Sequence, residues 1–307
     1  MRIASLLPSA TEIAFALGLG DEVVAVSHEC DYPPEASQRP VLTKSALHEK
    51  IHRSLEVDRE VEKRGGDIYE IDEKLLEKLQ PDLILTQELC AVCAVSYTKV
   101  KEAARVLEAD TRIISLEPTS LEEIVDNILL VGKTTGRLER ARELGSQLLS
   151  RINTVKSKTR NLRSTPRVFF MEWLQPPWAG GHWIPQMVDY AGGFEGLGRL
   201  GKPSHRIDWS EVLDYQPEVI VLSPCGFDLN GVMGELHELR SYHGWDKIPA
   251  YKYGTIYAVN ASAYFSRPGP RIVNGLELLA HIIHPELFPE TALAHEIKRI
   301  DLSFLKA

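Results

Sequence analysis

Short apolar runs alternate with helical patterns along the first half of the chain. The runs at 2–7, 22–27, 82–86 and 112–116 are rich in Val, Ile and Leu, and most segments between them carry apolar residues at helical spacing. Short buried strands separated by amphipathic helices are typical of βαβ units and a parallel sheet. The exception is 45–67, which is charged and predicts a helical insertion or a mobile loop.

The longest helical pattern lies near the middle of the chain, at 135–161. Its apolar stripe advances by steps of three and four through Leu138, Ala141, Gly145, Leu148, Ile152 and Val155. At 1.5 Å per residue such a helix is roughly 40 Å long. A second α/β pattern follows it, so we expect an N-terminal lobe at 1–119, connecting helices at 120–165 and a C-terminal lobe at 166–307.

The two halves share a repeated segment. Residues 75–90 and 210–226 both read as a helix, then Gln-Pro-acid, then a buried strand, then a loop with a cysteine. The same order in both halves predicts two Rossmann-like lobes with mostly parallel sheets, joined by the long helix.

Composition and charge narrow the class of partner. The net charge is -8, and no basic cluster is interleaved with aromatic residues, which argues against a nucleic-acid surface. No uncharged apolar window reaches the length of a membrane span. Small molecules or proteins are the expected partners.

The first twenty residues predict a strand and a helix rather than a secretory leader. Pro8 and Glu12 interrupt the apolar run, and Ser9 with Glu12 forms the pattern of a capping box. Four cysteines are too few for a disulfide framework and favour a reducing compartment. We expect a cytoplasmic protein, or a periplasmic or extracellular one if a leader has been removed.

Three segments carry a family resemblance: PSATE at 8–12, DYPP at 31–34, and MEWLQPPWAGGHWIPQMVDYAGG at 171–193. They resemble class III substrate-binding proteins of ABC importers, nearest to the cobalamin-binding branch. The resemblance implies two α/β lobes with a ligand cleft between them and a corrinoid (cobalamin) as ligand, with haem or a siderophore as the alternative. The residues expected at the ligand are Tyr32, Trp173, Trp178, His182, Trp183, Trp209, Phe265, Arg267 and Arg271. Of these, His182 could ligate a metal centre or bond an amide, or simply cap a turn, and the two arginines could bind an anion or pair with an acid such as Glu172.

A set of thiols and an imidazole departs from the family pattern. His28 and Cys30 follow the second predicted strand, and Cys90 and Cys93 follow a later strand of the same sheet. Three thiolates and one imidazole form a tetrahedral set for zinc, so a zinc or iron ion is one expectation. Buried small side chains or a reactive thiolate are the alternatives.

A second departure concerns the transporter. The family docks through one exposed glutamate per lobe, and those positions fall here at Lys74 and Ser210, with Glu73 and Glu211 adjacent. This makes docking on an ABC transporter doubtful.

An enzyme is the remaining alternative. A metal- or thiol-dependent enzyme on the same fold could use a cysteine near His28 as nucleophile, and as acid or base one of the expected cleft acids Glu12, Glu29, Asp31, Glu88 and Glu172. The sequence contains no Ser-His-Asp elbow and no Walker loop, so we favour a binding protein.

Overall fold

The computed structural model describes residues 1–47, 53–65, 68–88, 97–107, 110–289 and 291–301. The chain forms two compact units. The first comprises Met1–His52, Arg59–Pro118 and Glu122–Gln147, and the second comprises Arg53–Asp58, Thr119–Leu121 and Leu148–Ala307.

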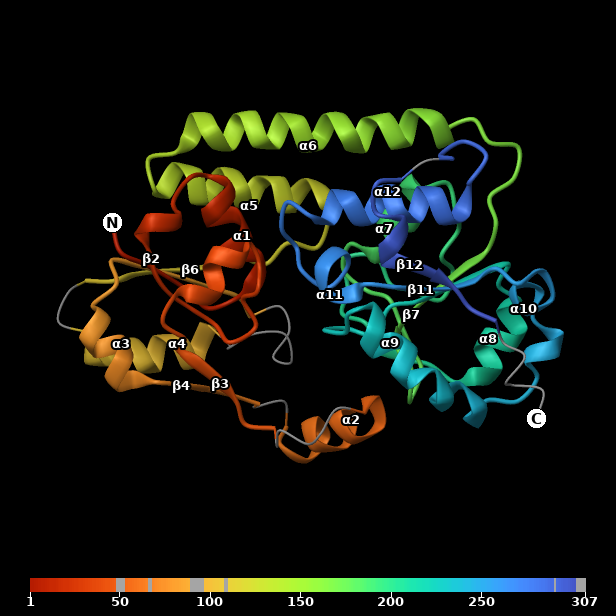
Figure 1. Ribbon diagram of the computed structural model, residues 1–307, viewed down its shortest axis with the longest axis horizontal. Coiled ribbons are helices and arrows are strands. Elements are labelled where there is room, and N and C mark those ends of the chain that lie inside the picture. The colour runs from red at the N-terminus through yellow and green to blue at the C-terminus, as the bar shows by residue number, and fades with distance from the viewer. Residues whose placement is uncertain (48–52, 66–67, 89–96, 108–109, 290, 302–307) are drawn as a thin grey trace. The chain divides into compact units, whose positions relative to one another are not determined.

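The first unit contains a four-stranded parallel sheet in the order β2-β1-β5-β6 (Figure 1). The two central strands are buried throughout, as expected for strands covered by helices on both faces. Helices α1 and α5 cover one face, and α3 and α4 cover the other. The elements are β1 (Ile3–Ser5), α1 (Pro8–Ala16), β2 (Val23–Val26), α3 (Glu73–Leu79), β5 (Leu83–Thr86), α4 (Tyr97–Ala103), β6 (Arg112–Ser115) and α5 (Leu121–Thr134), with an antiparallel hairpin of β3 (Thr43–Ser45) and β4 (Tyr69–Ile71).

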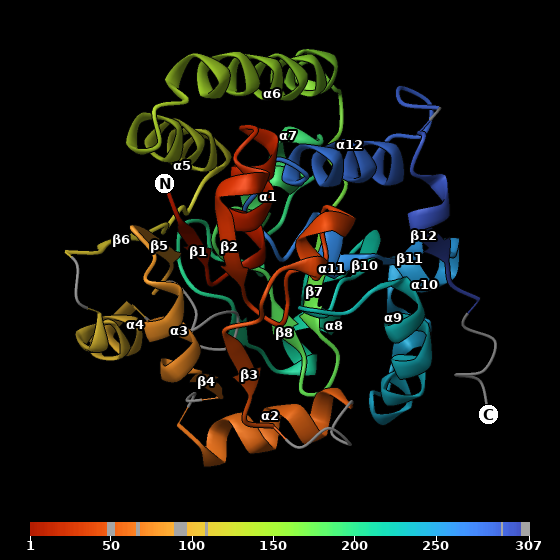
Figure 2. The same cartoon turned by 60° about the vertical axis from the view of Figure 1, so that its left-hand side comes forward.

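The second unit contains a six-stranded mixed sheet in the order β12-β11-β10-β7-β8-β9. The strands β7, β10 and β11 are parallel, whereas β8, β9 and β12 are antiparallel to their neighbours. Helices α7 and α12 lie on one face, and α8 and α9 lie on the other (Figure 2). The elements are β7 (Val168–Trp173), β8 (Trp178–Ala179), α7 (Ile184–Tyr190), β9 (His205–Arg206), α8 (Trp209–Tyr215), β10 (Val219–Leu222), α9 (Leu229–Glu235), α10 (Pro249–Tyr253), β11 (Ile256–Val259), α11 (Ala261–Tyr264), α12 (Ile272–Ile283) and β12 (Ile297–Arg299).

The predicted long helix is α6 (Leu138–Thr159), which has 22 residues. Ala141, Leu148, Ile152 and Val155 are buried along one stripe, as the spacing predicts. The α/β fold class expected from the sequence is confirmed.

The internal repeat extends further than the sequence pattern alone indicated. The helices α3 and α8 follow Asp72 and Asp208, and each ends at a glutamine in the left-handed conformation, with φ of 41° at Gln80 and 55° at Gln216. A proline, an acid and a buried strand follow in both copies.

An arginine before the first strand of each unit bonds the end of that same helix. The Nε of Arg2 donates to the carbonyl of Leu79 at 2.8 Å, and the Nε of Arg167 donates to the carbonyl of Gln216 at 2.9 Å. Both arginines therefore satisfy a carbonyl that the helix itself leaves without a donor.

Three local expectations need correction or refinement. The Ser9–Glu12 capping box is wrong, because α1 begins at Pro8 and Ser9 lies buried inside it. The sequence pattern at 234–245 predicts a helix, but the chain there forms the end of α9 followed by 3₁₀ turns. In the charged 45–67 segment the described part contains a helix, α2 (Ser54–Lys63). Among the described residues, no helix is long and apolar enough to cross a membrane.

Candidate ligand-binding site

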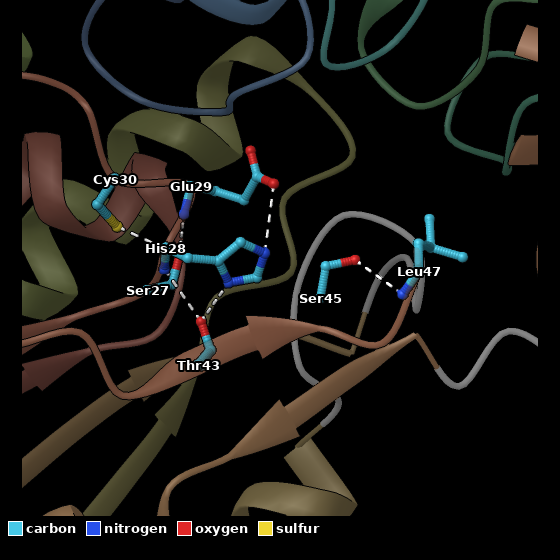
Figure 3. Close-up of polar contacts among 7 residues, drawn as sticks. All are labelled: Ser27, His28, Glu29, Cys30, Thr43, Ser45 and Leu47. Atoms are coloured by element: carbon cyan, nitrogen blue, oxygen red, sulfur yellow. Dashed lines mark hydrogen bonds and ion pairs between the residues drawn. The ribbon is translucent and has the colours of Figure 1, made fainter. Parts of the chain in front are cut away.

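The loop after β2 in the first unit holds His28 in a fixed orientation (Figure 3). Its backbone N–H donates to Thr43 Oγ1 at 3.0 Å, and the same oxygen lies 2.7 Å from the ring Nδ1. The ring Nε2 lies 3.4 Å from Glu29 Oε1. A proton on Nε2 suits both contacts, since the N–H then faces the carboxylate without a hydrogen bond to it, while Nδ1 accepts from the threonine hydroxyl. Burial lowers the pKa of His28 and Glu29 opposes that shift, so the ring is neutral at pH 7.

Cys30 has hydrogen-bonding partners of its own. Its buried Sγ lies 3.1 Å from Thr11 Oγ1 and 3.4 Å from Ser27 Oγ. The other two members of the predicted zinc or iron set, Cys90 and Cys93, lie outside the described residues. Within the described residues, no group of three His, Cys, Asp or Glu side chains is placed to hold a metal ion.

The other first-unit candidates lie in different environments. Tyr32 is exposed beside the same loop, as is Asp31. Glu12 is buried in α1, and Glu88 accepts a hydrogen bond from Thr98 Oγ1 at 3.0 Å. The loop after β2 thus contains His28, Glu29 and Cys30. Tyr32 is the one aromatic residue among the first-unit candidates for the ligand.

In the second unit, Trp173 and Trp178 are paired across the antiparallel strands β7 and β8. The Trp173 ring makes an edge-to-face contact with Phe227 at a centroid distance of 5.6 Å. The indole nitrogen of Trp178 is buried without a hydrogen-bond partner among the described residues. An unsatisfied buried N–H is costly, so this side chain is the stronger candidate of the two for contact with a ligand.

Three of the expected ligand residues pack into the unit itself. The Nε1 of Trp183 donates to the carbonyl of Phe265 at 3.0 Å, and both residues are buried. Trp209 stacks on Tyr242 with ring centroids 4.5 Å apart and donates to the carbonyl of His243. Trp183 and Phe265 therefore belong to the core of the unit, and Trp209 is a partly buried residue that packs against a core cluster.

His182 adopts a backbone conformation that is uncommon for a residue other than glycine, with φ of 49°. The conformation is held by its N–H, which donates to Lys202 O at 2.6 Å, and by its carbonyl, which accepts from Gly201 N at 2.9 Å. Burial lowers the pKa of the imidazole, and its Nε2 lacks a partner among the described residues. A neutral imidazole with a free ring nitrogen is suited to bind a metal centre or an amide.

The two arginines lie at the start of α12. Arg267 is buried, and the Arg271 guanidinium lies 5.9 Å from the centre of the Tyr264 ring. That distance allows a cation–π contact.

Glu172, near the end of β7, has hydrogen-bonding neighbours that no sequence pattern predicts. The hydroxyl of Ser204 donates to its Oε2, and the backbone N–H of Gly181 also donates to the carboxyl group. Burial is the main reason that its pKa rises to about 8, and the nearby Cys225 and Glu195 act in the same direction. Glu172 therefore holds a proton at neutral pH, although the residue keeps some exposed surface.

The second unit also includes Arg53–Asp58, which the sequence did not place there. The backbone N and the Oγ of Ser54 both donate to Glu235 Oε2, at 2.8 and 2.7 Å. The indole N–H of Trp173 donates to the carbonyl of Ser54 at 3.1 Å. Glu235 and Ser54 are both buried, and residues so far apart in sequence leave no local pattern that would reveal the contact.

Comparison with known proteins places this chain among binding proteins. The family model described as periplasmic binding protein matches residues 3–263. The vitamin B12-binding protein of Vibrio cholerae is 27% identical over 283 residues, which cover 90% of this chain and 86% of that protein. An uncharacterized ABC transporter substrate-binding lipoprotein of Bacillus subtilis, YvrC, is 26% identical over 295 residues, 94% of this chain and 82% of that protein.

Solved structures share the fold. The periplasmic vitamin B12-binding protein of Vibrio cholerae superposes with a TM-score of 0.65 at 24% identity, covering 94% of this chain and 98% of that one. The periplasmic haem-binding protein RhuT from Roseiflexus sp. RS-1 gives 0.68 at 23% identity, covering 93% and 98%. The expectation of a cytoplasmic protein is wrong, because these relatives are periplasmic proteins or a lipoprotein of an importer.

Proposed function

Because this chain belongs to the periplasmic binding protein family, we propose that it binds a corrinoid outside the cytoplasmic membrane and delivers it to an ABC importer. The observation that carries the proposal is the similarity to a vitamin B12-binding protein over nine-tenths of the chain. The exposed part of Trp178 and the free Nε2 of His182 supply a flat apolar contact and a ligand for cobalt.

The test is a visible absorbance spectrum of the purified protein before and after mixing with hydroxocobalamin and desalting. Retained corrinoid bands at one equivalent per chain are the expected result. A band shift that disappears in His182→Ala would show that the imidazole replaces the axial water. A protein that retains no corrinoid contradicts the proposal.

Haem is the second candidate, because a neutral imidazole at His182 is also a suitable iron ligand. The same experiment with haemin separates the two. If the dissociation constant for haemin were far below that for hydroxocobalamin, haem would be the ligand in place of a corrinoid.

The aromatic contact has a matched control. Trp178→Ala should weaken corrinoid binding by about tenfold or more, since it removes a large apolar face. Tyr253→Ala removes an aromatic ring that is exposed on α10 and should leave the affinity unchanged. If both variants changed the corrinoid affinity equally, Trp178 would not be a contact of the ligand.

Delivery to an importer would use the first turns of α3 and α8. Glu73 and Lys74 are exposed at the start of α3, and Ser210 and Glu211 are exposed at the corresponding turn of α8. The Glu211 carboxylate also accepts from the N–H of Asp208 at 2.8 Å. We expect charge reversal at Glu73 and Glu211 together to abolish binding to the partner importer in lipid nanodiscs without changing ligand affinity.

A further inference from the structure

The contact between Ser54 and Glu235 has the chemistry of a bound amide. Ser54 presents two donors, its backbone N–H and its hydroxyl, to one carboxylate oxygen at 2.8 and 2.7 Å. Its carbonyl accepts the indole N–H of Trp173 at 3.1 Å. A primary carboxamide offers the same groups, namely N–H donors and one carbonyl acceptor.

The two groups that hold Ser54 lie where a ligand is expected. Trp173 lies at the carboxyl end of β7, and Glu235 is linked to it through Ser54, which hydrogen-bonds both residues. Ligands of parallel α/β sheets bind beyond the carboxyl ends of the strands. Glu235 is 5% exposed and Ser54 is fully buried, so this contact excludes water.

A further contact holds the same turn of α2 in place. The Nη2 of Arg206 lies 2.8 Å from Asp58 Oδ2, one turn beyond Ser54. The Arg53–Asp58 segment is therefore attached to the second unit at both ends of a single helical turn.

We propose that Glu235 and Trp173 form a carboxamide-recognition pair, and that Ser54 occupies this pair as an internal competitor when no ligand is bound. This inference rests on the proposed function and refines it. A corrinoid carries carboxamide side chains, whereas haem carries carboxylates. The Glu235 carboxylate accepts hydrogen bonds from the former and repels the latter, so the pair selects amide-bearing ligands.

The test measures the affinity for two ligands in two variants, one at each partner of the Ser54–Glu235 hydrogen bond. Ser54→Ala weakens the competitor and leaves the pair intact, so the dissociation constant of hydroxocobalamin should fall by about two- to tenfold, whereas that of haemin should stay unchanged. Glu235→Gln removes the repulsion of carboxylates, so haemin should gain at least about tenfold over hydroxocobalamin. A contact that is only structural would shift both ligands equally in both variants, and that result would overturn the proposal.

A matched control isolates the charge. Glu238→Gln removes a negative charge three residues beyond Glu235, from a side chain whose Oε1 lies 3.3 Å from His237 Nε2. The ratio of the two dissociation constants should stay unchanged in this variant. If the ratio changed as much as in Glu235→Gln, the effect would come from the overall negative charge of this region. That result would contradict the proposed recognition pair.

A second measurement separates this proposal from the proposed function. If the wild-type protein binds neither ligand, the proposed function fails, and small probes then test the pair directly. In Ser54→Ala, acetamide should shift the indole N–H resonance of Trp173 in a ¹H–¹⁵N spectrum, whereas acetate should not. The absence of a shift with acetamide, or an equal shift with acetate, would overturn the proposal.

Discussion

The hydroxyl of Ser204 donates a hydrogen bond to a carboxyl group, that of Glu172, which burial keeps protonated near neutral pH. The pKa of this group is about 8 in the folded chain and lower in the unfolded one. Between these values the folded state binds more protons than the unfolded state, so the free energy of unfolding falls as pH rises.

This linkage predicts a pH-dependent effect of Glu172→Gln, which keeps the acceptor for Ser204 but cannot ionise. The variant should gain stability relative to the wild type between pH 5 and pH 8, with a slope of at most about 1.4 kcal/mol per pH unit. Urea unfolding at several pH values measures it. Glu117→Gln is the control, because Glu117 accepts from Ser115 in an exposed position. If the unfolding free energies of the wild type and Glu172→Gln changed with pH in parallel, burial would not raise the pKa of Glu172.

Replacing each of two tryptophans by phenylalanine should change the unfolding free energy differently. Trp183→Phe removes a donor that bonds the Phe265 carbonyl, and we expect a loss of about 1–3 kcal/mol in unfolding free energy. Trp178→Phe removes a buried N–H that has no partner among the described residues, so stability should be unchanged or higher. Denaturant unfolding of both variants gives the comparison. A clear destabilisation by Trp178→Phe would mean that its indole nitrogen is hydrogen-bonded.

The duplicated arginine contact predicts equal effects in the two units. Arg2→Met and Arg167→Met keep the apolar stem of the side chain but lose the bond to a helix-end carbonyl; Arg167→Met also loses an exposed ion pair with Glu218, which contributes little. Each should lower the unfolding free energy by about 0.5–1.5 kcal/mol. Arg160→Met, at an exposed position near the end of α6, should have almost no effect and serves as the control. A cost confined to one of the two contacts would show that the copies are not energetically equivalent.

The imidazole of His28 should carry its proton on Nε2 at pH 7.5, because Nδ1 lies against Thr43 and Nε2 lies against Glu29. Long-range ¹H–¹⁵N spectra report the tautomer directly. Since the pKa of His28 is lowered in the folded chain, the unfolded state takes up a proton first as pH falls through 6.5, and stability should then decrease. A proton found on Nδ1 would reverse the assigned hydrogen bonds.

The fold followed from the sequence because its signals are local. The stripe through Ala141, Leu148 and Ile152 fixed one face of α6, and the Gln-Pro-acid repeat located corresponding helices and strands in both halves. The start of α1 was misjudged because Pro8 at the first helical position prevailed over a capping pattern that involves Ser9.

The site was harder to predict because its contacts join residues that are distant in sequence. Ser54 and Glu235 are 181 positions apart, and Glu172 and Ser204 are 32 apart. The tryptophans were easy to single out by type, but only the structure separates Trp183, which bonds the Phe265 backbone, from Trp178, which has no such partner.

The left-handed glutamines after α3 and α8 are a repeated feature of the two halves. Each side-chain amide donates to a carbonyl three residues earlier, Gln80 to Glu77 at 2.7 Å and Gln216 to Leu213 at 2.5 Å. Glycine would relieve the backbone strain but lose that hydrogen bond, and these terms offset to within about 1 kcal/mol. Stability alone therefore does not require glutamine at either position. The shared glutamine therefore belongs to the repeated order of helix, Gln-Pro-acid and buried strand rather than to a local demand for stability.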